Sequence, residues 1–117
     1  MKPEGFPRSA KLKLKDEFQA VLETGGKTAT RDFVMWWKTG SPAATPRLGI
    51  MVSKKAGGAV RRNRLKRLVR EVFRLNRQSI RADAELVLYP RPGNKLDGYG
   101  SACESIRAIW QKAGLAQ

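Results

Sequence analysis

The residues best suited to chemistry in this sequence are basic ones, gathered in a single stretch. Positions 54–77 hold ten Lys or Arg residues and one acid, Glu71. Arginine predominates, and its planar guanidinium binds phosphate through two parallel hydrogen bonds and also stacks on bases. The stretch therefore predicts recognition of a phosphate-rich partner, above all RNA.

The same stretch carries the apolar spacing of a helix that packs on a core. Its apolar arc consists of Leu65, Leu68, Val69, Val72 and Phe73. Its opposite arc consists of Asn63, Lys66, Arg67, Arg70, Arg74 and Arg77, and Arg64 lies between the arcs, beside Glu71. Like charges four residues apart, as at Lys66 and Arg70, destabilise a free helix. An anionic partner would offset that cost, so a merely solvated face is the weaker interpretation.

Side chains for catalysis by the protein itself do not occur in any familiar combination. There is no histidine, which removes the commonest general base, and the ten acids are scattered. The single cysteine, Cys103, lies beside an apolar arc and is expected to be a buried structural thiol. Gly57-Gly58 predicts only a flexible loop. We expect no catalytic residue and no organic cofactor in this chain.

Length and charge limit the class of protein. A chain of 117 residues predicts one domain with its own core. The net charge of +14 favours an anionic partner, with nucleic acid ahead of a membrane surface or an acidic protein. No apolar stretch approaches the roughly 20 residues of a membrane span. With one cysteine and no signal-peptide core, the sequence predicts a cytoplasmic protein.

Two capping-box patterns predict the starts of the flanking helices. Asp16 with Gln19 predicts a short helix that Gly25 or Gly26 ends, with Phe18, Val21 and Leu22 on one face. Ser101 with Glu104 predicts the start of a final helix. The apolar residues of that helix are Ala102, Ile106, Ile109, Trp110 and Ala113.

Three segments predict strands. They are Lys27 to Lys38, broken near Arg31-Asp32, Leu48 to Ser53, and Glu85 to Tyr89. The basic helix, from about Ala59 to Arg77, joins the last two, which are therefore expected to be parallel. Alternation places Phe33, Met35 and Trp37 on one face and Val34, Trp36 and Lys38 on the other. The fold class is α/β (α+β), with about four strands and three helices in residues 15–117 and a loose basic arm in residues 1–14.

These residues resemble the protein subunit of bacterial ribonuclease P. The string Arg62-Asn63-Arg64-Leu65-Lys66-Arg67-Leu68-Val69-Arg70-Glu71-Val72-Phe73-Arg74 carries the resemblance. Leu48 to Lys55, Asp16-Glu17-Phe18-Gln19 and Arg31-Asp32-Phe33-Val34 also fit the family, in the right order. The resemblance implies a small sandwich like the second domain of ribosomal protein S5. It also implies a left-handed crossover through the basic helix, against the usual right-handed rule.

The resemblance further implies a function. The family's protein assists a catalytic RNA in removing the 5′ leader of precursor tRNA, with Mg²⁺ held mainly by the RNA. One protein monomer per RNA, without membrane contact, is expected. The positions implied to bind RNA are Lys54, Lys55, Arg62, Asn63, Arg64, Lys66, Arg67, Arg70 and Arg74. A cleft for the single-stranded leader is implied at Phe18, Leu22 and Trp36.

Some alternatives stay open at this point. Leu22 stands where the family often has an aromatic, so Trp36 is the stronger stacking candidate. Trp36 could also be ordinary core, and Trp37, on the opposite strand face, is expected to be core. A structural RNA-binding protein, such as a ribosomal protein, shares the size and charge. A helix-turn-helix DNA-binding domain fits less well, because sheet-forming segments flank the basic helix, and a membrane-active helix fits least.

Overall fold

The computed structural model describes residues 15–42 and 45–116, and the predicted basic arm, residues 1–14, lies outside them. One four-stranded sheet organises the described chain, with strand order β1-β2-β4-β3. The strands are β1 (Gly26–Ala29), β2 (Phe33–Lys38), β3 (Arg47–Ile50) and β4 (Glu85–Pro90). The helices are α1 (Lys15–Thr24), α2 (Ala59–Asn76) and α3 (Tyr99–Lys112), with short 3₁₀ turns η2 (Lys54–Ala56) and η3 (Arg77–Ser79).

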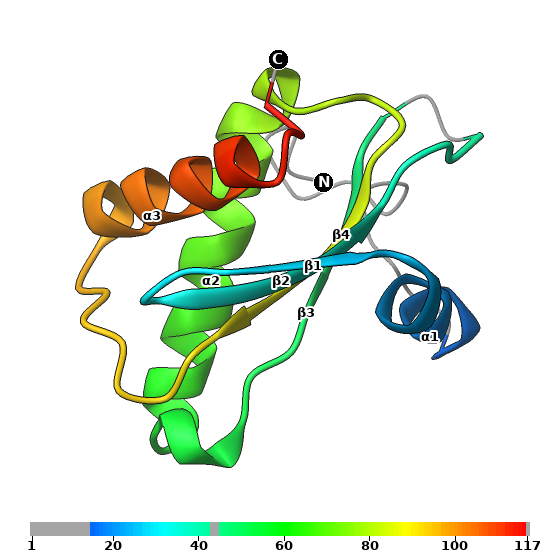
Figure 1. Ribbon diagram of the computed structural model, residues 1–117. Helices are drawn as coiled ribbons and strands as arrows, with labels where there is room; N and C mark the ends of the chain where they lie inside the picture. Colours follow the sequence, from blue (N-terminus) through cyan, green and yellow to red (C-terminus); the bar gives the residue numbers. More distant parts are fainter. Residues whose placement is uncertain (1–14, 43–44, 117) are drawn as a thin grey trace, which may run out of the picture.

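The sheet is mixed, as the order of its elements requires. β1 and β2 form an antiparallel hairpin whose turn is residues 30–32, where the sequence predicted an interruption of the strand. β2 pairs antiparallel with β4. β3, which α2 connects to β4, pairs parallel with it, as predicted for these two strands. Figure 1 shows α2 and α3 on one face of the sheet and α1 on the other.

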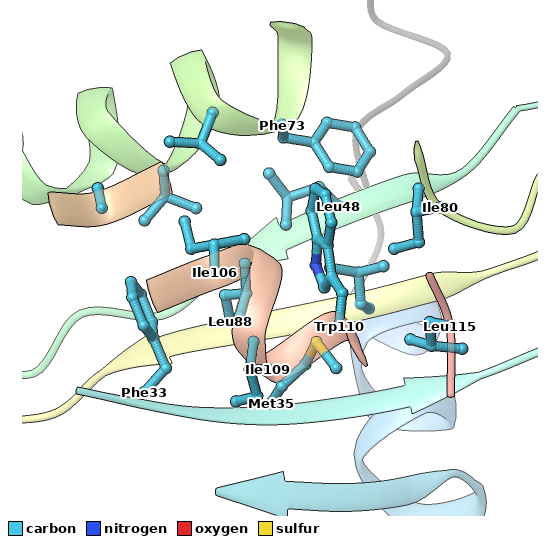
Figure 2. Close-up of a cluster of buried hydrophobic side chains, with 14 of the residues drawn as sticks. Phe33, Met35, Leu48, Phe73, Ile80, Leu88, Ile106, Ile109, Trp110 and Leu115 are labelled. Atoms are coloured by element: carbon cyan, nitrogen blue, oxygen red, sulfur yellow. The ribbon is translucent and has the colours of Figure 1, made fainter. Parts of the chain in front are cut away.

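The main core lies between the sheet and the pair α2 and α3. Figure 2 shows Phe33 and Met35 of β2 and Leu88 of β4 pointing toward Phe73 of α2 and Trp110 of α3. The rings of Phe73 and Trp110 meet edge to face, with centroids 6.5 Å apart. The predicted apolar arcs of α2 and α3 are confirmed, because their residues form or border this core. Trp37 packs against the same core, as predicted. Cys103 borders this core but is only half-buried, so the prediction of a buried thiol was wrong, because the side chain lies beside the apolar arc of α3 and not within it.

The predicted helix starts were wrong in both capping boxes. α1 begins at Lys15, so Asp16 lies inside its first turn, where a carboxylate still interacts favourably with the helix dipole. α3 begins at Tyr99 and has Gly98 as its N-cap. The Ser101 hydroxyl accepts the Asp97 N–H at 3.1 Å and lies 2.9 Å from the Asp97 carboxylate. Ser101 therefore closes the preceding loop, and the N-cap of the helix lies three residues earlier than predicted.

The strand before α2 is shorter than the predicted Leu48 to Ser53. β3 ends at Ile50, although the Met51 N–H still donates to the Leu88 carbonyl at 3.0 Å. The chain then leaves the sheet because Ser53 caps η2, with its hydroxyl accepting the Lys55 N–H at 3.0 Å. Gly57 follows at a φ of 137°, a conformation that glycine readily adopts. This turn delivers the chain to the start of α2.

Candidate nucleic-acid interface

The outer face of α2 is the most strongly cationic feature of the described residues. Its inner face is anchored by four fully buried side chains, Leu65, Val69, Val72 and Phe73. That anchoring fixes the rotation of the helix, so the basic residues of the opposite arc face away from the sheet. Burial of the apolar face therefore stabilises a helix whose outer face carries like charges, although repulsion between those charges would destabilise the isolated helix.

Four of the predicted binding residues lie on this outer face with their polar groups available. They are Asn63, Lys66, Arg67 and Arg70. Among the described residues none forms a hydrogen bond or ion pair with these side chains. Lys54 and Lys55 add two exposed charges from η2, immediately before the helix. The structure thus places predicted positions on two consecutive elements, η2 and α2.

Two other predicted positions are engaged within the protein. Arg74 donates to both oxygens of Glu71, at 3.2 and 2.7 Å, and this bond lowers the pKa of that carboxyl. Arg64 donates to the Asp97 carbonyl at 2.6 Å. Arg64 and Glu71 lie seven residues apart on α2, at nearly the same angle around the helix as predicted, and the partner of the Glu71 carboxylate is Arg74. Arg62 is half-buried, and its Nε has no partner among the described residues.

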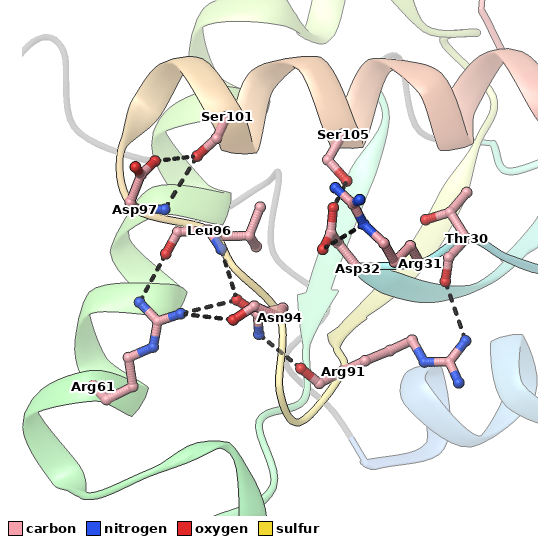
Figure 3. Close-up of polar contacts among 10 residues, drawn as sticks. All are labelled: Thr30, Arg31, Asp32, Arg61, Arg91, Asn94, Leu96, Asp97, Ser101 and Ser105. Carbon is pink, nitrogen blue, oxygen red and sulfur yellow. Dashed lines mark hydrogen bonds and ion pairs between the residues drawn. The ribbon is translucent and has the colours of Figure 1, made fainter.

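Arg61 points inward and ties a loop to α2, as Figure 3 shows. It donates to the Leu96 carbonyl at 2.9 Å and to the Asn94 side-chain oxygen at 2.9 Å. The Asn94 side chain in turn donates to the Arg91 carbonyl at 2.7 Å and accepts the Leu96 N–H at 3.1 Å. These contacts hold the β4–α3 loop against the first turn of α2, a role that helical spacing did not reveal.

The second candidate surface lies on the face of the sheet that carries α1. Val21 and Val87 are buried there, with Phe18, Leu22, Trp36 and Met51 packed around them. The three predicted cleft residues, Phe18, Leu22 and Trp36, therefore come together. All three are half-buried, as side chains between a core and an open surface are. Gly49 of β3 allows the close approach of α1, because a Cβ there would lie 2.5 Å from the Phe18 ring.

Two residues that sequence reasoning missed extend this aromatic surface. The Tyr89 ring lies edge-on to Trp36, with centroids 6.4 Å apart, and the Lys27 ammonium lies 5.5 Å from the centre of the Trp36 ring. Strand register explains both, since Lys27 pairs with Trp36 and Tyr89 pairs with Val34. A cation over an aromatic face is worth roughly 0.5–1 kcal/mol when exposed. The sequence did not reveal these two neighbours of Trp36 because it does not give the register of β1, β2 and β4.

An ion-pair cluster, Glu17, Arg47, Glu85 and Lys38, fixes α1 to the edge of the sheet. Arg47 binds Glu17 through two bonds of 2.6 and 3.0 Å and approaches Glu85 at 3.4 Å. Lys38 lies 3.6 Å from the other oxygen of Glu85. Hydrogen bonding to Glu17 is the main cause that raises the pKa of Arg47. The cluster sets the position of α1 and hence of Phe18.

Residues 15–42 and 45–116 contain no group of three or more His, Cys, Asp or Glu side chains placed to hold a metal ion. Within the same ranges, no helix is long and apolar enough to cross a membrane. The concentrated chemical features are thus the cationic face of α2 and the aromatic face beside α1.

A small α+β domain with a cationic helix on one side of its sheet and an aromatic surface on the other has the features typical of the nucleic-acid-binding class of proteins. Comparison with known proteins makes the assignment specific: the Ribonuclease P family model matches residues 6–114. The chain therefore belongs to the ribonuclease P protein family, and its function is that of the protein subunit of ribonuclease P.

Curated relatives and solved structures agree with this assignment. The ribonuclease P protein components of Dictyoglomus turgidum and Dictyoglomus thermophilum are 36% and 38% identical to this chain. They align over 94% and 93% of it, and over 93% and 92% of their own lengths. The RNase P protein of Staphylococcus aureus superposes with a TM-score of 0.82 at 29% identity, over 92% of this chain and 98% of that one. The Thermotoga maritima protein gives 0.75 at 29% identity, over 86% and 96%.

Proposed function

We propose that this subunit binds the catalytic RNA of ribonuclease P through the outer face of α2. We also propose that it binds the 5′ leader of precursor tRNA on the aromatic face beside α1. The single observation that supports this best is the set of basic side chains on α2 that no described carboxylate neutralises. Phosphates of the RNA subunit supply the missing counter-charge.

Binding through α2 has a measurable electrostatic signature. If about six phosphates are neutralised, log affinity falls with log salt concentration at a slope of roughly −4 to −5. Arg74 can contact a phosphate only while it also binds Glu71 or by giving up that ion pair. Lys66, Arg67 and Arg70 have no ion pair with the described residues to give up, so we place the main phosphate contacts at these three residues.

The leader interacts with the opposite face of the sheet. Single-stranded RNA favours aromatic platforms, and each stacked base contributes roughly 1–3 kcal/mol. Trp36, oriented by Tyr89, is the platform we propose, with Lys27 beside it for a leader phosphate. Phe18 and Leu22 form the wall that α1 contributes. Leader contacts raise affinity for the precursor over mature tRNA, which lacks these nucleotides.

The RNA subunit carries the chemistry in this proposal. It positions Mg²⁺ for hydrolysis of the phosphodiester, which leaves a 5′-phosphate on the tRNA. The protein screens phosphate repulsion and orients the leader, and no side chain of this chain is assigned a catalytic role. One monomer per RNA, acting in the cytoplasm with its RNA partner, completes the proposal.

Reconstitution tests the proposal directly. Precursor tRNA is incubated at low Mg²⁺ with the RNA subunit alone, with the protein alone, and with both. We expect efficient cleavage at the mature 5′ end only when both are present. Cleavage by the protein alone would refute the assignment of the chemistry to RNA.

A charge-matched pair of variants tests the α2 contact. Arg70→Ala should weaken binding of the RNA subunit and reduce the magnitude of the salt slope by about one. Arg107→Ala removes one exposed charge from α3 and serves as the control, with affinity and slope close to those of the unmodified protein. Equal effects of the two substitutions would mean that only net charge matters, contrary to the proposal.

A further inference from the structure

A groove lies between the first half of α2 and the start of α3. It encloses about 500 Å³, within the range of roughly 300–1,000 Å³ that is usual for sites binding small groups. It is lined by Val60, Asn63, Arg64, Arg67, Leu68, Gly98 and Tyr99. The leader surface described above lies on the other face of the sheet, so the groove is a separate site.

The groove has two chemically different sides. Arg64 and Arg67 make one side cationic, whereas Val60, Leu68 and Tyr99 make the other apolar. The described residues include three exposed large apolar side chains, Val60 at 85%, Leu75 at 55% and Tyr99 at 38% exposure, and two of them line this groove. A phosphate backbone gains nothing from apolar contacts, so charge alone does not account for this composition.

Several hydrogen bonds hold the walls of the groove in fixed positions. The Tyr99 hydroxyl accepts a hydrogen bond from the Asn76 side-chain amide at 2.9 Å, and the same amide donates to the Val72 carbonyl at 2.8 Å. Arg64 is oriented by its bond to the Asp97 carbonyl. A platform that is ordered before binding loses less entropy when a ligand arrives. The ring and the guanidinium are therefore ready to receive a flat group.

We propose that this groove binds one unpaired nucleotide of the RNA subunit. The base lies against Tyr99 and the apolar side chains, its phosphate binds Arg67 and Arg64, and the Asn63 amide faces the edge of the base. Unstacked bases of RNA are recognised by aromatic rings, guanidinium planes and amide groups of this kind. The inference rests on the proposed binding of α2 to the RNA subunit and adds recognition of a base to recognition of phosphates.

An uncharged substitution separates stacking from charge. Tyr99→Leu should weaken binding of the RNA subunit by roughly 5- to 150-fold, the loss of one stacked base. Because no charge is removed, the slope of log affinity against log salt should stay unchanged. Tyr99→Phe keeps the ring and loses only the hydroxyl, so it should retain most of the affinity. Chemical probing of the RNA should show one unpaired nucleotide protected by the unmodified protein and by Tyr99→Phe, but reactive with Tyr99→Leu.

A second variant and a control keep the outcome clear if Tyr99→Leu folds poorly. Val60→Asp changes a side chain that is 85% exposed, so it leaves folding intact while it places a carboxylate in the groove. It should weaken binding and expose the same nucleotide, whereas Glu23→Gln, an exposed change on α1, should do neither. Normal affinity and protection with both Tyr99→Leu and Val60→Asp would overturn the inference.

Failure of this inference can be distinguished from failure of the proposed function. If Arg70→Ala lowers affinity and the salt slope while the groove variants bind normally, α2 binds RNA but the groove does not hold a base. If Arg70→Ala also binds normally, the α2 interface itself is wrong. An equal loss of affinity with Tyr99→Leu and Tyr99→Phe would assign the effect to the hydroxyl, which both variants lack, and overturn the stacking arrangement.

Discussion

Substitution of Gly49 by alanine tests whether the close approach of α1 to β3 shapes the leader surface. A Cβ at this position would lie 2.5, 2.8 and 3.0 Å from Cζ, Cε1 and Cε2 of Phe18. These distances are far below van der Waals contact, so the Phe18 ring must shift, either by changing its rotamer or by moving with α1. Overpacking of this kind costs about 1–3 kcal/mol of folding free energy.

The effect on binding follows from the geometry. Displacement of Phe18 disturbs the surface it shares with Leu22 and Trp36, whereas α2 lies on the other face of the sheet. We therefore expect the Gly49→Ala holoenzyme to bind precursor tRNA more weakly, by up to the roughly 1–3 kcal/mol of one stacked base. Affinity for mature tRNA, and affinity of the protein for the RNA subunit, should be unchanged.

The assay combines urea unfolding with equilibrium binding. Gly49→Ala, Phe18→Ala and the double variant form a cycle that measures the coupling between the two sites. Once the ring is removed, the new methyl group has room, so the folding penalty of Gly49→Ala should largely vanish in the Phe18→Ala background. Gly100→Ala is the control, because a Cβ there meets nothing within 4 Å and α3 gains a better helix former. An equal penalty in both backgrounds would refute the steric argument.

Three further predictions concern the polar contacts. Arg47→Met should cost about 3 kcal/mol in urea unfolding, since it removes the common partner of Glu17 and the buried Glu85, and Arg47→Lys should recover part of the loss. Arg61→Met should cost about 1.5–3 kcal/mol and increase hydrogen exchange in residues 91–98, because Leu96 and Asn94 lose a charged donor; unchanged exchange would contradict that role. Glu71→Gln should remove the ion pair between Glu71 and Arg74, tighten binding of the RNA subunit and steepen its salt dependence, whereas weaker binding would show that the ion pair orients Arg74 for contact.

Much of the fold followed from periodicity alone. The spacing of Leu65, Val69 and Val72 specified both the existence of α2 and the direction of its basic face, because one helix rotation buries all three. Alternation along β2 likewise placed Trp36 and Trp37 on opposite faces, and the helical connection implied that β3 and β4 are parallel. These features depend on the periodicity of each helix or strand and on the type of connection between strands, which a local pattern records.

The roles of individual polar side chains depended on residues far away in the sequence. Arg61 and Arg64 look like their basic neighbours, yet loop carbonyls more than 30 residues away bind them. Lys27 and Tyr89 join Trp36 only through the register of three strands. The groove beside Tyr99 exists because the β4–α3 loop packs along α2. A sequence pattern states which side chains are basic or aromatic, but only the packing of distant segments decides which of them keep their polar groups available to RNA.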